Sequence, residues 1–144
     1  MTENTLILIL PNIFICSECD NKILQDNSIN NIININNSLI NFNMYNTLNI
    51  NVNDFNDLVH SNNYAELDLN AINDFIINIL NNKENVVICD NSYVFGFIIL
   101  CAFILKFMNM TFTETMMYVQ RKMDIDIKTI PQILFFQLFD FYTH

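Results

Sequence analysis

The chain has 144 residues and a mass of 16.9 kDa, and 52% of its residues are hydrophobic. This size predicts one domain, covering residues 1–144, with a core of its own. The formal charge of −9 and the pI near 4.3 argue against a nucleic-acid partner, because phosphates would be repelled. The longest apolar run, residues 93–105, is shorter than the ~20 residues that a membrane-spanning helix needs, so we expect no membrane span.

The first half of the chain predicts strands with one short helix. Residues 27–63 are rich in Asn, but their Ile, Leu, Phe and Val alternate with polar residues, which is the period of half-buried strands. Pro11 separates the first two apolar segments. The predicted elements are strands at 6–10 and 12–15, a helix at 20–26, strands at 31–36 and 47–52, and a polar loop at 53–63.

The second half predicts one buried strand and four helices. Residues 86–88 are wholly apolar, as expected of a central strand. Thr111 or Thr113 is placed to cap one late helix, and Pro131 is placed in the first turn of the last one. The predicted elements are a helix at 64–81, a strand at 86–88, and helices at 95–108, 113–122 and 130–142. This order predicts an α/β domain with a mixed sheet and helices on both faces.

The cysteines indicate a cytoplasmic protein. Without a secretory signal in the first residues, we expect free thiols in a reducing compartment. Cys16 and Cys19 form a lone C-x-x-C pair, whereas structural zinc normally takes four ligands. His60 and His144 are the histidines that could complete a site, but no second cysteine pair follows, so we predict no metal and no cofactor. The four cysteines are Cys16, Cys19, Cys89 and Cys101.

The amino-acid usage also suggests a kind of source. Asn and Ile are over-used, while the chain has one Gly and two Pro. This bias is typical of an AT-rich coding genome, such as that of a large DNA virus or an intracellular parasite. For a viral protein, we expect a location in the host-cell cytoplasm or the virion.

An apolar strand, a cysteine, a short loop and an apolar helix follow one another at residues 86–108. This layout resembles the signature of the cysteine-based phosphatases. The chain as a whole resembles the dual-specificity protein phosphatases, which implies a protein tyrosine phosphatase-like fold with a central mixed sheet of about 4–5 strands flanked by helices. Other segments that are similar to the family pattern, in the same order, are 9–15, 29–35, 51–54, 113–122 and 130–138.

The resemblance implies positions for the catalytic groups of such an enzyme. The chemistry needs a thiolate nucleophile, backbone N–H groups that bind the phosphate, a guanidinium that grips it, and an acid for the leaving oxygen. Cys89 stands at the nucleophile position and Asp54 at the general-acid position. The family writes the loop as H-C-x-x-G-x-x-R-[ST], and the aligned stretch here is Ile88-Cys89-Asp90-Asn91-Ser92-Tyr93-Val94-Phe95-Gly96.

Four positions of this loop depart from the family pattern. Phe95 stands at the Arg position and cannot grip phosphate. Ser92 stands at the Gly position, and its Cβ disfavours a positive φ. Ile88 replaces the His that tunes the cysteine, and Gly96 replaces the Ser or Thr that follows the Arg. The resemblance therefore implies a degenerate phosphate-binding loop.

Asp90 adds a negative charge one residue from the thiol, which opposes both thiolate formation and binding of a dianion. We therefore predict that no residue is catalytic and that Cys89 and Asp54 are vestigial positions. The plainer interpretations are that Cys89 is an inert core thiol and that Asp54 is an exposed loop acid. Either way, the sequence predicts a pseudophosphatase.

The leading functional prediction is a regulatory pseudophosphatase that binds an unidentified protein partner. Aromatic residues crowd the last predicted helix on more than one face, which indicates an exposed apolar patch. Such a patch also fits a structural homodimer built on the late apolar helices. A weaker alternative is a residual phosphatase that uses Cys89 and Asp54. The aromatic residues are Phe135, Phe136, Phe139, Phe141 and Tyr142.

Overall fold

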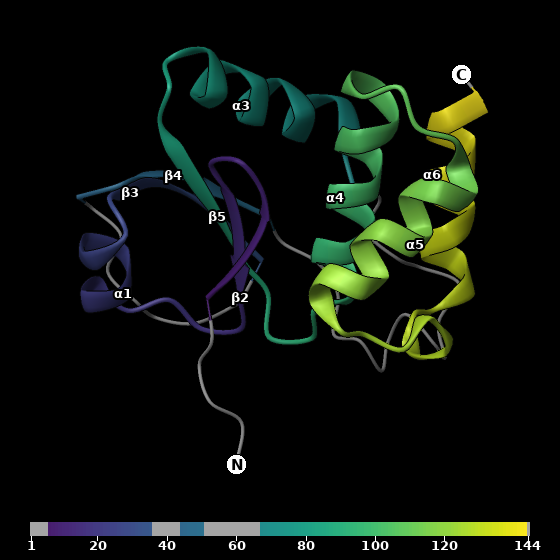
Figure 1. Cartoon of the computed structure of the whole chain (residues 1–144), viewed down its shortest axis with the longest axis horizontal. Helices are drawn as coiled ribbons and strands as arrows, with labels where there is room; N and C mark the ends of the chain where they lie inside the picture. The colour runs from purple at the N-terminus through teal and green to yellow at the C-terminus, as the bar shows by residue number, and fades with distance from the viewer. Residues whose placement is uncertain (1–5, 36–43, 51–66, 144) are drawn as a thin grey trace.

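The computed structural model describes residues 6–35, 44–50 and 67–143 (Figure 1). It is an α/β fold that contains every strand and helix predicted from the sequence, with shifted ends, and a short 3-10 helix that was not predicted. The elements are β1 (Ile7–Leu10), β2 (Ile13–Cys16), α1 (Asn21–Asp26), β3 (Ile29–Asn34), β4 (Asn46–Asn49), α3 (Leu69–Asn81), β5 (Asn85–Cys89), α4 (Val94–Phe107), α5 (Phe112–Met123), η1 (Ile127–Thr129) and α6 (Gln132–Thr143).

The strands form one mixed, five-stranded sheet in the order β1-β2-β5-β3-β4. The central strand β5 pairs in parallel with β2 on one side and with β3 on the other. β3 also pairs in parallel with β4, whereas β1 and β2 are antiparallel. The predicted mixed sheet flanked by helices is therefore confirmed.

The two faces of the sheet are covered unequally. Figure 1 shows α1 on one side of the sheet and α4, α5 and α6 on the other. Along β5, Val86 and Ile88 belong to the large core beneath α3–α6, and the alternate residues Val87 and Cys89 belong to a separate small core beside α1. The buried residues of this small core are Cys16, Cys19, Leu24, Ile29, Ile32, Val87 and Cys89.

Helix α4 fills the middle of the large core. Every residue from Val94 to Ile104 is buried, which explains why this run is apolar on all sides. Its Phe97 ring packs edge-on against Phe135 of α6, with ring centroids 6.3 Å apart. Within the described part of the chain, no helix is both long enough and apolar enough to cross a membrane.

Side-chain caps set the starts of two other helices. The Asp68 carboxylate accepts a hydrogen bond from Ala71 N (3.1 Å), so α3 starts at Leu69, later than the predicted start at residue 64. At α5 the cap is Thr111 rather than Thr113. The prediction for the last helix was wrong in detail, because α6 begins at Gln132 and Pro131 lies just before it.

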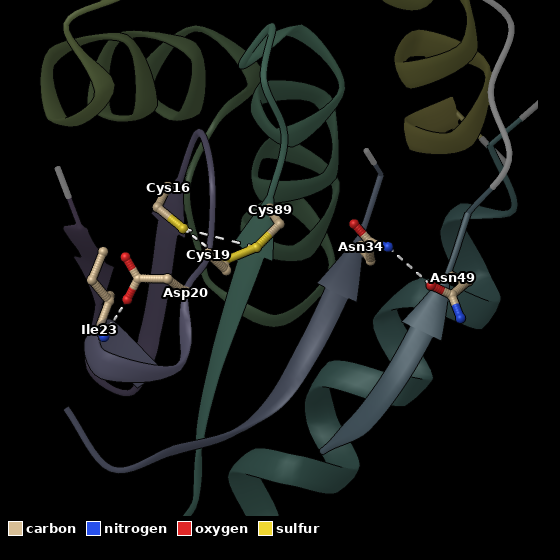
Figure 2. The surroundings of a disulfide bond; sticks show 7 residues. All are labelled: Cys16, Cys19, Asp20, Ile23, Asn34, Asn49 and Cys89. Atoms are coloured by element: carbon tan, nitrogen blue, oxygen red, sulfur yellow. Dashed lines mark hydrogen bonds between the residues drawn. A yellow bond between two sulfur atoms is a disulfide. The ribbon is translucent and has the colours of Figure 1, made fainter. Parts of the chain in front are cut away.

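Asparagine side chains join the strands of the Asn-rich segments. β3 begins two residues earlier than predicted and includes the buried Asn31. The Asn31 side chain donates to Asn85 O (2.9 Å) and accepts from Asn46 Nδ2 (3.0 Å), so the burial of its amide is compensated. Asn34 donates to Asn49 Oδ1 (3.1 Å) in the same way, at the ends of β3 and β4 (Figure 2).

Candidate functional site

The loop that aligns with the phosphatase signature lies between the central strand and the buried helix. β5 ends at Cys89 and α4 starts at Val94. The loop is held at both ends, since Asp90 N donates to Cys16 O (3.0 Å) and Tyr93 N donates to Asp90 O (3.2 Å). Tyr93 has a φ of 64°, which is unusual for a residue with a side chain. The strand–loop–helix unit expected from the sequence is therefore present.

The Asp90 carboxylate is buried and points into this loop. It accepts hydrogen bonds from Ser92 N (3.1 Å), Ser92 Oγ (2.9 Å) and Gly96 N (2.8 Å). Burial raises the pKa of the Asp90 carboxyl, while its hydrogen bonds with Gly96 and Ser92 act in the opposite direction. Free N–H groups at a helix start are the groups that bind anions in proteins. Here a carboxyl side chain of the loop itself accepts hydrogen bonds from two of the N–H groups around the start of α4.

Two neighbours of this carboxylate have packing roles. Phe95 is 4% exposed and belongs to the large core. Gly96 is the only glycine of the chain, and a Cβ atom at this position would run into the Ile15 side chain of β2. Glycine therefore lets α4 approach the sheet closely, which brings Gly96 N within reach of Asp90.

Three cysteines meet on the α1 side of the sheet (Figure 2). The register of β2 and β5 pairs Cys16 with Cys89, and Cys19 returns to them after a turn. Cys19 and Cys89 form a disulfide. The Cys16 Sγ lies 2.8 Å from the Cys19 Sγ and 3.8 Å from the Cys89 Sγ. We call these three residues the sulfur cluster.

The sulfur cluster corrects the expectation of four free thiols. Cys19 and Cys89 are bonded, while Cys16 and Cys101 are free and buried. Burial, followed by the nearby charge of Asp20, raises the pKa of the Cys16 thiol to about 12, and burial also raises the pKa of Cys101. Neither free cysteine is a thiolate at neutral pH, and a bonded Cys89 has no thiolate with which to attack phosphorus.

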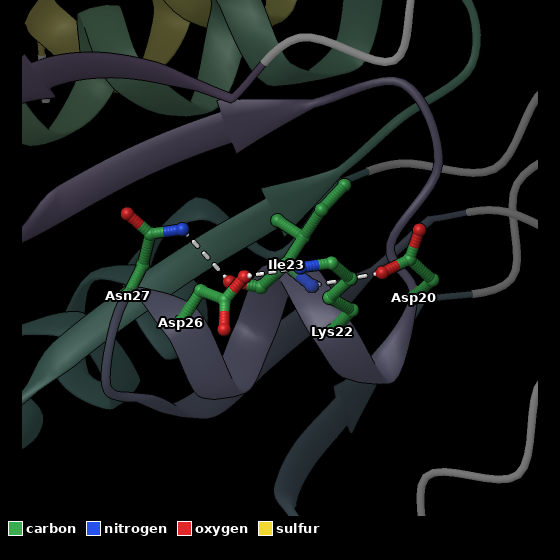
Figure 3. Close-up of polar contacts among 5 residues, drawn as sticks. All are labelled: Asp20, Lys22, Ile23, Asp26 and Asn27. Carbon is green, nitrogen blue, oxygen red and sulfur yellow. Dashed lines mark hydrogen bonds and ion pairs between the residues drawn. The ribbon is translucent and has the colours of Figure 1, made fainter.

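Helix α1 closes the small core over the sulfur cluster. Leu24 of this six-residue helix is fully buried there. Figure 3 shows how polar contacts hold the helix: the Asp20 carboxylate accepts from Ile23 N (2.8 Å), and Lys22 pairs with Asp26 (3.1 Å). The short helix predicted at residues 20–26 is confirmed, with Asp20 as its cap.

The sulfur cluster is also a group that sequence reasoning missed. Its three sulfurs all lie within 4.8 Å of one another, close enough to share one metal ion. A lone C-x-x-C pair gave no signal for this, since the third sulfur comes from a strand 73 positions away from Cys16. Asp54, His60 and His144 lie outside the described residues, so the vestigial general acid remains a prediction.

The apolar patch predicted on the last helix is present in part. Phe136, Phe139 and Tyr142 are exposed on α6, with exposed fractions of 61%, 56% and 47%. Phe135 and Phe141 are instead partly buried against the large core. The exposed rings form a surface that is available for contact, and homodimer formation through it remains a prediction.

The five-stranded mixed sheet, the loop after β5 and the buried α4 together make a protein tyrosine phosphatase-like fold, the fold of the dual-specificity phosphatases. Three solved structures carry this conclusion. A leucine-rich repeat and phosphatase domain-containing protein from Entamoeba histolytica is 20% identical, with a TM-score of 0.71 and coverage of 96% of this chain and 91% of that one.

The second structure is a mouse putative dual specificity phosphatase complexed with zinc tungstate, 13% identical, with a TM-score of 0.75 and coverage of 99% and 89% of the two chains. The third is a human tyrosine phosphatase-like serine/threonine/tyrosine-interacting protein, 18% identical, with a TM-score of 0.76 and coverage of 98% and 97%. These likenesses show the fold. The sequence matches no protein-family model and no curated protein.

Proposed function

We propose that this protein is a catalytically inactive, phosphatase-like protein that acts by binding another protein. The observation that carries the proposal is the place of the Asp90 carboxylate, which accepts hydrogen bonds from Ser92 N and Gly96 N. In an active enzyme of this fold, N–H groups of this loop are expected to bind the phosphate of the substrate.

A substrate would have to compete with this carboxylate. Asp90 is tethered next to the N–H groups and is 2% exposed, whereas a phosphate dianion arrives from solvent and loses its freedom of motion on binding. In its ionised form, Asp90 would also repel a second anion at this helix start. The loop is therefore a poor phosphate receptor.

Two other groups that catalysis requires, the guanidinium and the thiolate, are also missing from the proposed site. Phe95 stands where the guanidinium is expected, and loss of one oxyanion donor costs about 2.7–4 kcal/mol of transition-state stabilisation. Cys89 is bonded to Cys19 and is 1% exposed, so its sulfur is neither ionised nor accessible. Reduction of the disulfide would release a thiol that remains in the small core.

A binding role agrees with the remaining observations. One protein with the same fold is named as a phosphatase-like, interacting protein, which is a precedent for this fold in that role. The charge of −9 favours a basic partner surface, and the exposed rings of α6 offer apolar contacts.

Turnover of a generic aryl phosphate tests the proposal directly. The purified full chain, assayed with and without a thiol reductant, is expected to release no more product than its Cys89→Ser variant. An active dual-specificity phosphatase in parallel confirms the assay. Robust wild-type turnover that disappears in Cys89→Ser would overturn the proposed inactivity.

A structural homodimer is the second candidate, favoured by the exposed Phe136 and Phe139 of α6. Light scattering across a dilution series separates the two. A dimer that persists on dilution and is lost in Phe136→Ser/Phe139→Ser supports self-association. A monomer at every concentration supports a different partner. Leu8→Ser, which changes an exposed apolar residue of β1, is the matched control.

A further inference from the structure

The sulfur cluster gathers three buried cysteines from two parts of the chain into one small core. We propose that Cys16, Cys19 and Cys89, in their reduced form, bind one thiophilic metal ion, Zn²⁺ or Cu⁺. The proposal goes beyond the proposed function and does not rest on it. Its readout is metal uptake, so it can fail while the protein proves inactive, and it can hold while the protein proves to be an enzyme.

The number of sulfurs is the first argument. The disulfide needs only Cys19 and Cys89. If Cys16 served for packing alone, an apolar side chain would fill its place equally well. Cys16 is nevertheless a third sulfur, fully buried and within 3.8 Å of both others. All three ligand atoms lie within 4.8 Å of one another. One shared metal ion accounts for all three sulfurs.

The spacing agrees with a metal site. Zn–S bonds are about 2.3 Å long, so two sulfurs of one tetrahedral site lie roughly 3.8 Å apart, and three protein ligands leave the fourth position of Zn²⁺ to a ligand from solvent. The Cys16 and Cys89 sulfurs are separated by 3.8 Å, because their strands are paired in register. Cys19 follows β2 in a non-strand segment, and its side chain is the one that must rotate to make room for the ion.

The surroundings select the kind of ion. The described ligands are all sulfur, and the residues packed around them in the small core are apolar. Thiolates favour Zn²⁺ and Cu⁺, whereas Mg²⁺ and Ca²⁺ prefer oxygen ligands. The negative charge of Asp20, which acts on Cys16, adds to the attraction for a cation.

The chemistry balances with one named co-reactant, a small-molecule thiol. Two such thiols reduce the Cys19–Cys89 disulfide to two thiols and become a disulfide themselves. The ion then replaces the protons of the three S–H groups, and those protons pass to solvent. The oxidised chain, as described here, and the metal-bound chain are thus alternative states of the same three sulfurs.

Metal titration of the full chain tests the proposal. The chain is reduced with a phosphine, its free thiols are counted, and Zn²⁺ or Cu⁺ is added anaerobically in competition with a chromogenic chelator. We expect one ion per chain. Because loss of an outer-shell group alone costs about 10–100-fold in affinity, Cys16→Ser, Cys19→Ser and Cys89→Ser should each lose more than about 100-fold.

Cys101→Ala is the matched control, because Cys101 is an equally buried free cysteine of α4 outside the sulfur cluster. It should keep the wild-type affinity. No uptake of either ion by the fully reduced wild-type chain would overturn the proposal, and so would binding that survives Cys16→Ser.

A second readout needs no variant and covers the case in which the serine variants do not fold. The wild-type chain is alkylated with and without the ion, and the labelled positions are mapped by mass spectrometry. The ion should slow labelling of Cys16, Cys19 and Cys89 by a larger factor than labelling of Cys101. Equal slowing of all four would contradict a site at the cluster.

Discussion

The helices α4 and α5 follow each other in the chain but begin in different ways. α5 begins with an exposed capping box, in which Glu114 N donates to Thr111 Oγ1 (3.1 Å) and Thr111 N donates to Glu114 Oε1 (3.0 Å). These contacts lower the pKa of the Glu114 carboxyl. α4 begins at a left-handed Tyr93 that provides no side-chain cap, and the buried Asp90 serves its N–H groups from the preceding loop.

The difference teaches that one structural requirement can be met in two different ways. Both helices must satisfy their first N–H groups. At α5 an exposed capping box of neighbouring residues provides the acceptors. At α4 the same need is met by the buried Asp90 carboxyl, which accepts a hydrogen bond from Gly96 N. Under the proposed function, this is the position where an active enzyme of this fold would bind phosphate.

The largest expected effect comes from introducing a cation at the start of α4. Phe95→Arg places a guanidinium in the large core, and an uncompensated buried charge costs about 3–5 kcal/mol of unfolding free energy. Urea denaturation measures this loss. Phe136→Arg, at a residue that is 61% exposed, should change stability little. Retained stability of Phe95→Arg would mean that the new side chain leaves the core and reaches Asp90.

An intermediate effect is expected for Asp90→Asn. The substitution removes a carboxylate oxygen that accepts from Gly96 N, and the unpaired buried donor should cost about 1–3 kcal/mol. Urea denaturation at neutral pH measures this cost. An unchanged stability would show that Asp90 contributes nothing to the start of α4.

Comparison of wild type with Asp90→Asn also shows how the contribution of Asp90 to stability depends on pH. Burial raises the carboxyl pKa in the folded chain above its ordinary value of 3.8, so between these two pKa values the folded chain holds a proton that the unfolded chain has released. Stability contributed by this group is therefore full below pH 3.8 and decreases as the pH rises through the folded pKa. The advantage of wild type over Asp90→Asn should grow on acidification, and an advantage that shrinks instead would contradict the raised pKa.

The smallest effect belongs to the exposed cap of α5. Thr111→Ala should lower the unfolding free energy by about 1 kcal/mol, because it leaves Glu114 N without its side-chain acceptor. Thermal denaturation measures the change. Thr113→Ala, at the neighbouring exposed threonine, is the control and should be nearly neutral. Equal effects of the two substitutions would show that the capping box does not stabilise this helix start.

The sequence was a good guide where the signal is local. Alternation of Ile and Asn revealed β3, and the wholly apolar run after residue 93 revealed α4 as a core helix. Local signals also existed for details that were missed, since Asp68 three residues before Ala71 is an ordinary N-cap pattern.

The sequence was a poor guide where contacts join distant segments. Cys16 and Cys89 meet through the register of parallel strands, which neither segment encodes alone. The hydrogen bond between Asp90 and Gly96 N depends on how closely α4 approaches the sheet, where a Cβ atom at position 96 would meet the Ile15 side chain. The presence of an acidic residue next to Cys89 was evident from the sequence, but its hydrogen bonds with Ser92 N and Gly96 N were not.

The position of β5 also has a consequence for the order in which the protein assembles during synthesis. The β1–β2 and β3–β4 pairs emerge from the ribosome first, but neither pair contacts the other in the finished sheet, because β5 lies between them. The edges of β2 and β3 that pair with β5 therefore remain without a partner strand until residues 85–89 have been synthesised. Pairing between strands that are far apart in the sequence slows folding. A nascent chain arrested before β5 would expose two unpaired strand edges that are prone to aggregation.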